Sequence, residues 1–259
     1  MNLPRAALLA LLALGAHACS KPSAPAPGAA PKAESAFKVA LLSPGPVSDA
    51  GWNAIAYEGL LRIEKELGAE ASQVETRSPA EFEKAFRDYA QRGFALVFGH
   101  GFEFQDAAAR VAPDFPRTVF VTTSGNTVRP NVAPMVFELE QAAYLLGMVA
   151  AGMTEGEEGV TAAIGGVEIP SIGSTFIAYE AGARAEKPGF RVLKSYIGNW
   201  EDVGAAKEAT LAALGRGAKF VFHNADAAGI GVFQAVRERP GAYAFGSNKN
   251  QNDVAPDVI

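Results

Sequence analysis

The stretch that decides the fold is FKVALLSPGPVSDAGWNAIAYEGLLRIEKEL, residues 37–67. The apolar run Val39–Leu42 is typical of a buried strand, and Trp52–Leu67 carries apolar residues at the spacing of one helix face. A loop rich in glycine, proline and polar residues separates the two. The stretch therefore predicts a strand, a polar loop and a helix, and we expect Asp49 to cap that helix.

The same unit recurs along the chain, although no short-period sequence repeat is present. One predicted helix has Pro79 at its first position, follows the capping-box pair Ser78 and Glu81, and stops at Gly93. Another is expected to start at Ser174, which would cap it. Strands that alternate with helices of this length favour parallel sheets covered by helices on both faces.

Two α/β lobes are expected, because residues 127–138 (TVRPNVAPMVFE) resemble a crossover between domains. The predicted boundaries are an N-terminal lobe of residues 37–132 and a C-terminal lobe of residues 133–259, with a ligand cleft between them. The last residues follow a strand without a closing helix, so we expect the sequence to be truncated before the chain returns to the first lobe.

The N-terminal residues predict an anchor and a tether. Residues 1–19 hold an early cation, a short apolar run and small residues before Cys19, as a secretory signal does. Their end resembles a bacterial lipobox, which would make Cys19 the lipidated first residue of the mature protein; a plain signal peptide is the alternative. Residues 20–36 are rich in proline, alanine and serine and predict a disordered tether. We expect a lipid-anchored protein on the periplasmic or extracytoplasmic face of the cell membrane.

Composition and motifs argue against several functional classes. The net charge of -5 leaves no excess of positive charge for binding nucleic acid. A single cysteine excludes an intrachain disulfide. Signatures of dinucleotide-binding proteins, P-loop proteins, serine hydrolases and zinc proteases are missing. His100 and His223 each end a predicted strand but have no partners at metal-ligand spacing. We therefore expect no catalytic residue, no metal and no cofactor.

Polar or glycine-rich clusters follow the predicted strands, and open α/β sheets bind ligands at that edge. Four aromatic residues stand beside these clusters: Trp52, Phe102, Phe176 and Trp200. The amides and carboxylates that would bind the edge of a flat ring are Asn53, Asp202, Asn224, Asp226 and Asn248. Sugars also stack on tryptophan, so these residues leave a heteroaromatic ring and a sugar open as ligands. The alternative to ligand binding is that the polar residues form turns and the aromatic residues pack in the core.

Seven motifs, in order along the chain, resemble the basic membrane protein family: SDAGWN, GHGFEF, YLLGMVAAGM, GGVEIP, YIGNWED, HNADAAGIGV and FGSNKNQNDVAPDVI. The family consists of substrate-binding lipoproteins of ABC importers related to the bacterial purine nucleoside receptor. The resemblance covers residues 37–259. It implies a type I periplasmic-binding-protein fold, no catalytic activity, a purine nucleoside or base as the ligand and an ABC permease as the partner. We expect a monomer.

The resemblance also assigns roles to residues. Asp49 and Asn53 match an Asp…Phe-Asn motif that contacts the base, and Trp52 stands where many members have phenylalanine. Phe176 matches an aromatic residue that sandwiches the ring. Polar positions near the ligand are matched by Asp202 and Asp226, and the predicted ligand site is completed by His100, Gly101, Phe102, Trp200, Asn224 and Asn248.

Two departures from the family pattern concern the ligand. Residues 246–251 (GSNKNQ) lack the acidic residue with which many nucleoside binders hold ribose hydroxyls. The tryptophan-bearing form, with GHGF and NWED, resembles a subgroup that favours free bases such as adenine. Riboflavin or a sugar is the alternative ligand, and a ligand-sensing lipoprotein that acts on a membrane receptor is the alternative function.

Overall fold

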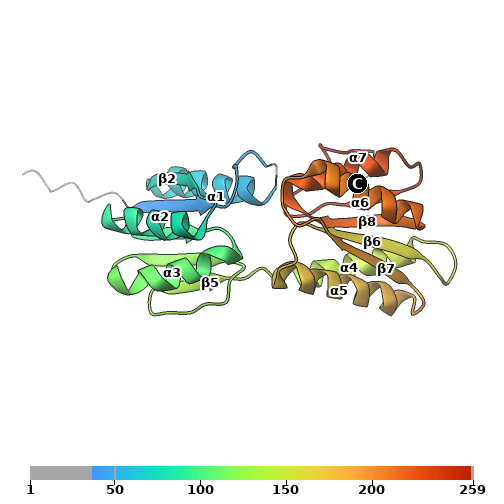
Figure 1. Ribbon diagram of the computed structural model, residues 1–259, viewed down its shortest axis with the longest axis horizontal. Coiled ribbons are helices and arrows are strands. Elements are labelled where there is room, and N and C mark those ends of the chain that lie inside the picture. The colour runs from blue at the N-terminus through green and yellow to red at the C-terminus, as the bar shows by residue number, and fades with distance from the viewer. Residues whose placement is uncertain (1–36, 50, 258–259) are drawn as a thin grey trace, which may run out of the picture. The chain divides into compact units, whose positions relative to one another are not determined.

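The computed structural model describes residues 37–49 and 51–257, so the predictions for Cys19, the signal and the tether lie outside the described residues. These residues form two α/β lobes, lobe 1 (residues 37–135) and lobe 2 (residues 139–257), each built on one parallel sheet (Figure 1). Both sheets carry helices, which confirms the predicted fold class. Within the described residues, no helix is both long enough and apolar enough to cross a membrane.

Lobe 1 has a five-stranded sheet in the order β2-β1-β3-β4-β5, with every pairing parallel. Its elements are β1 (Lys38–Ser43), α1 (Trp52–Leu67), β2 (Glu70–Glu75), α2 (Pro79–Gln91), β3 (Leu96–Gly99), η1 (Phe102–Phe104), α3 (Gln105–Val111), η2 (Ala112–Asp114), β4 (Val119–Thr123) and β5 (Val132–Met135). The bounds of α1 are those predicted from the sequence, because its apolar residues keep helical spacing from end to end.

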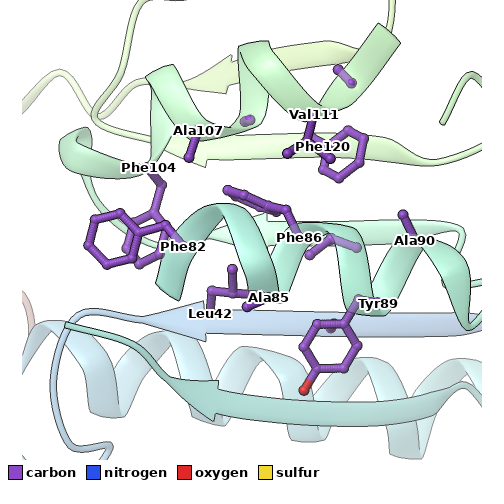
Figure 2. Close-up of a cluster of buried hydrophobic side chains, with 14 of the residues drawn as sticks. Leu42, Phe82, Ala85, Phe86, Tyr89, Ala90, Phe104, Ala107, Val111 and Phe120 are labelled. Atoms are coloured by element: carbon purple, nitrogen blue, oxygen red, sulfur yellow. The ribbon is translucent and has the colours of Figure 1, made fainter. Parts of the chain in front are cut away.

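Alternate residues of the lobe 1 strands face opposite sides of the sheet. Ala40 and Leu42 point into a core under α2 and α3, while Val39 and Leu41 point toward α1. Figure 2 shows the first of these cores, in which aromatic rings of α2 and of the β3–α3 connection meet above the sheet. Both faces are therefore apolar, and the strands between them read as continuous hydrophobic runs.

Lobe 2 has a four-stranded parallel sheet in the order β7-β6-β8-β9. Its elements are α4 (Leu139–Gly152), β6 (Val160–Gly165), α5 (Pro170–Glu186), β7 (Arg191–Tyr196), α6 (Val203–Gly215), β8 (Ala218–Asn224), η3 (Asp226–Gly229), α7 (Ile230–Arg237) and β9 (Tyr243–Phe245). One face of the sheet packs on α6 and α7, and the other on α4 and α5.

Three local predictions differ from the structure. Strand β2 was not predicted, and Val132–Met135, expected within the crossover, forms strand β5. The sheet of lobe 1 consequently ends at Met135, three residues beyond the expected boundary. The helix expected to start at Ser174 starts at Pro170, and Ser174 donates its hydroxyl to the Glu140 carboxylate instead of capping. Proline at the first helical position is a start signal that outweighs the serine.

Candidate functional site

The order of the strands in each sheet indicates where a ligand site lies. In each sheet the second strand lies on one side of the first and the third strand on the other, so the strand order switches at β1/β3 and at β6/β8. Open α/β sheets bind ligands outside such a switch point. The loops that follow these strands line one cavity of about 110 Å³ with residues of both lobes. Nine predicted site residues line this cavity: Asp49, Trp52, Asn53, Gly101, Phe102, Trp200, Asn224, Asp226 and Asn248.

The indole of Trp52 has a rigid support. It stacks on the His100 imidazole with 4.2 Å between ring centroids and 20° between ring planes, and Phe137 meets it edge-on at 5.7 Å. The imidazole itself is fixed, because Nε2 lies 2.9 Å from the Trp52 carbonyl oxygen and Nδ1 lies 3.1 Å from Thr123 Oγ1. His100, predicted as a ligand contact, therefore lies behind Trp52 rather than among the residues lining the cavity.

Burial lowers the pKa of His100 to about 4. At neutral pH the ring is uncharged, so it supports the indole as a flat aromatic surface and adds no positive charge to the site. This charge state suits stacking of a neutral aromatic ligand on Trp52.

The Asp49 carboxylate organises the loop before α1. Its two oxygens accept hydrogen bonds at 2.8–3.0 Å from the backbone N–H groups of Gly51, Asn53 and Ala54 and from the side-chain amide of Asn53. The prediction that Asp49 caps α1 is confirmed by these bonds. Both oxygens of the carboxylate are engaged in these bonds with the loop.

Asn53 offers the site a free acceptor. Its Nδ2 donates to Asp49, and its Oδ1 is buried without a hydrogen-bond partner among the described residues. The side chain as a whole is 4% exposed. An orphaned buried acceptor costs about 1–3 kcal/mol, so a donor group that reaches it stabilises the complex by a comparable amount.

Asp226 reaches from lobe 2 to the start of α1. Its Oδ1 accepts a hydrogen bond of 2.8 Å from the Trp52 backbone N–H. Burial, and then the neighbouring Asp49 carboxylate, raise the pKa of Asp226 to about 8. The group is therefore mostly neutral at pH 7 and can both accept and donate hydrogen bonds.

Backbone strain is concentrated in the cavity wall. Among the described residues, the non-glycine residues with positive φ are Ser124 (58°), Asp226 (51°) and Asn248 (66°), and all three line the cavity. Such conformations cost about 1–3 kcal/mol each and cluster at ligand sites. Ser124 is not among the predicted site residues, although it lies in a polar stretch with a glycine, residues 122–126 (TTSGN), at the end of β4.

Two predicted site residues lie elsewhere. Phe176 is fully buried in the core of lobe 2, where its ring stacks on Tyr196 at 5.3 Å and meets Phe222 edge-on. This position follows from the helix start: α5 begins four residues earlier than expected, so Phe176 falls in the second turn and packs in the core of lobe 2. Asp202 caps α6 by accepting a hydrogen bond from the Ala205 N–H, and it lies outside the cavity.

A second cavity, of about 270 Å³, lies against the apolar face of α1. Residues of both α1 and the sheet line it, among them Leu41, Ile55, Leu60, Ile63 and Phe98. The two cavities share a wall formed by Trp52, Phe137, Leu139 and Asn248. Phe137 was missed from the sequence because it lies within the predicted crossover (residues 127–138), away from the predicted strand ends.

The site has an acidic lining. Glu103 and Glu201 join Asp49 and Asp226, and among the described residues that line the cavity there is no lysine, arginine or histidine. No group of three or more histidine, cysteine or acidic residues within the described part of the chain is arranged to hold a metal ion. The site as it stands can stack a flat ring and bind its edge through amides and carboxyl groups.

The comparisons with known proteins identify relatives for almost the whole described chain. The family model for PnrA-like ABC transporter substrate-binding proteins matches residues 36–259. The transcriptional activator protein med of Bacillus subtilis is 26% identical over 223 residues, covering 86% of this chain and 68% of its own length. A purine-binding protein of Brucella abortus is 26% identical over 234 residues, covering 89% of this chain and 65% of its own length.

The chain thus spans about two thirds of the length of these curated relatives. Among solved structures, an ABC transporter solute-binding protein from Conexibacter woesei is 30% identical, with a TM-score of 0.65 over 82% of this chain and 71% of that chain. This likeness agrees with two parallel-sheet lobes of the type I periplasmic-binding-protein fold.

Proposed function

Since this chain belongs to the family of PnrA-like ABC transporter substrate-binding proteins, we propose that it binds a purine nucleoside or a purine base and delivers it to an ABC permease. The observation that carries the proposal is a supported indole face and an unpartnered buried amide oxygen in one cavity. A purine offers a flat ring for the first and N–H donors for the second. The name of the Brucella abortus relative, a purine-binding protein, supports this ligand class.

In this proposal Trp52 stacks on the ring, and Asn53 accepts a hydrogen bond from its edge. Asn224 and the neutral Asp226 carboxyl lie in the same wall and supply further donors and acceptors. Phe102 and Trp200 border the cavity with additional aromatic surface. The protein carries out no reaction on the ligand and acts by capture and release.

We further propose that the two lobes are held at the membrane surface by a lipid anchor. Cys19 carries the lipid, residues 20–36 are the tether, and the two lobes act as a monomer on the extracytoplasmic face. Mass spectrometry of the membrane-extracted protein tests this arrangement: a diacylglycerol-modified Cys19 at the mature N-terminus is expected, and an unmodified cysteine or cleavage elsewhere contradicts it.

Isothermal titration tests the ligand. Adenine, adenosine, guanosine, riboflavin and ribose are titrated into the protein and into Trp52→Ala. Purine binding that the substitution weakens by about 1–3 kcal/mol, or about 5- to 150-fold in Kd, is expected for a lost base–aromatic stack. Leu61→Ala is the matched control, because Leu61 is exposed on the same helix and lines neither cavity. No response to purines with a clear response to riboflavin or ribose contradicts the proposed ligand.

A sensing function is the second candidate, because the Bacillus subtilis relative is named a transcriptional activator protein. The same cavity would then control a signal rather than uptake. Deleting the gene separates the two: loss of purine uptake supports transport, whereas unchanged uptake with altered transcription in response to the ligand supports sensing.

A further inference from the structure

We propose that Asp226 is a latch between the two lobes, whose neutral carboxyl group holds the first turn of α1 and with it Trp52, so that closing the cavity takes up a proton. The inference rests on the proposed function, because it concerns how the same ligand site is controlled. Besides its place in the cavity wall, Asp226 is then also a positioning residue that acts through Trp52.

The contact lies at the start of α1. Asp226 Oδ1 accepts the Trp52 N–H at 2.8 Å, although the two residues are 174 positions apart. The same oxygen would lie 2.6 Å from a Cβ at Gly51, so the carboxyl group sits directly against the loop backbone and requires glycine there. Asp226 also has a φ of 51°, a left-handed conformation that aspartate adopts at a cost.

Charge decides which form of Asp226 makes this contact. The neighbouring Asp49 carboxylate raises the pKa of Asp226, and it already binds the loop through four N–H bonds. An ionised Asp226 would place a second negative charge beside it in a half-buried setting, and the cavity lining that the structure describes holds no cation to offset the repulsion. The neutral form avoids this repulsion and can donate its proton toward Asp49.

The other charged groups on the elements around Asp226 do not change this result. Glu103, after β3, and Glu201, before α6, line the same cavity, and Glu201 pairs with Arg77 at 3.9 Å. Lys249 pairs with Glu58 of α1 at 3.3 Å. Lys207 on α6 pairs with Glu238 at 2.6 Å. His100 titrates at about 4 and is uncharged above that pH.

The sign of the pH effect follows from linkage. With the lobes in contact, the pKa of Asp226 is about 8, whereas in water an aspartate has a pKa of about 3.9. Between these values the closed form carries one more proton than the separated form. Closure, and the ligand affinity that depends on it, therefore weakens as pH rises through this window, by at most about tenfold per pH unit.

The test compares the Kd of adenine and of adenosine at pH 5.5 and pH 7.5. The native protein is expected to bind at least about tenfold more weakly at the higher pH, because two pH units lie inside the window. Asp226→Asn, which keeps an acceptor for the Trp52 N–H but cannot ionise, is expected to change by less than about threefold. Asp106→Asn, an exposed carboxylate outside both cavities, keeps the native pH dependence. A flat native profile, or equal slopes for the native protein and Asp226→Asn, overturns the latch.

Thermal denaturation without ligand separates this inference from the proposed function. The raised pKa means that the native protein loses stability relative to Asp226→Asn as pH rises from 5.5 to 7.5. If no purine binds at either pH, the proposed function is wrong. The difference in Tm between the native protein and Asp226→Asn still tests the proposed role of Asp226. A difference that widens with pH supports it, and a constant difference overturns it.

Discussion

Replacing Asp49 by alanine removes the carboxylate that holds the loop before α1. Four hydrogen bonds are lost, and their donors are the backbone N–H groups of Gly51, Asn53 and Ala54 and the Asn53 side-chain amide. Asn53 and Ala54 are buried, so water replaces the lost acceptor poorly. We expect the ligand-free protein to be destabilised, because these bonds hold the loop whether or not the cavity is occupied.

The magnitude follows from the burial of these groups. Loss of a helix cap costs about 1 kcal/mol, and each further buried donor left without a partner costs about 1–3 kcal/mol. Taking one cap for the Asn53 and Ala54 N–H groups and the low end of that range for the other two buried donors, the sum is about 3 kcal/mol. Asp202→Ala is the matched control, because Asp202 caps α6 through a single bond to the Ala205 N–H at an exposed position. It should cost about 1 kcal/mol.

The assay is urea denaturation of the ligand-free protein, with thermal melting as a second measure. A loss of about 3 kcal/mol corresponds to a fall in Tm of about 6–12 °C for a domain of this size, and the control variant should fall by about 2–4 °C. An Asp49→Ala protein that melts within about 2 °C of the native protein, yet binds ligand poorly, would refute the reasoning. Asp49 would then act on the ligand directly rather than through the loop.

Three further substitutions test other contacts. Gly51→Ala places a Cβ 2.6 Å from Asp226 Oδ1, so titration should show ligand affinity lowered by about tenfold, the loss of one hydrogen bond to a buried carboxyl; unchanged affinity would argue against the contact. Gly182→Ala places a Cβ against the Tyr144 carbonyl oxygen where α4 and α5 meet, so the Tm should fall by about 2–12 °C, as overpacking costs about 1–3 kcal/mol. Phe176→Ala should lower the free energy of unfolding by about 3–5 kcal/mol, the cost of a large core cavity, and a variant that stays stable while losing ligand binding would restore Phe176 to the site.

Most of the fold could be predicted because its helices and inner strands carry strong periodic signals. The two strands that were missed both lie at an edge of the lobe 1 sheet. Strand β2 reads EASQVE, and its residues are mostly half-buried, so it lacks the apolar run of an inner strand. Strand β5 contains Pro134, which an edge position tolerates but which argues against a strand in the sequence.

The candidate site could be predicted where it follows directly from a strand end. Trp52, Asn53 and Asp226 lie at the starts of the helices that follow β1 and β8, and a parallel sheet brings these helix starts to one edge. Phe137 and the support of Trp52 by His100 could not be predicted, since both depend on how distant segments meet. No pattern within a single loop encodes that meeting.

The chain holds two tryptophans, Trp52 and Trp200, and both line the candidate cavity. The tryptophan fluorescence of these 259 residues therefore comes from the candidate ligand site, because the sequence has no tryptophan elsewhere. A ring that stacks on Trp52 would quench this emission, and drying of the cavity would shift it to shorter wavelength. The molecule thus carries its own optical reporter, and occupancy can be followed in stopped-flow experiments without attaching a dye.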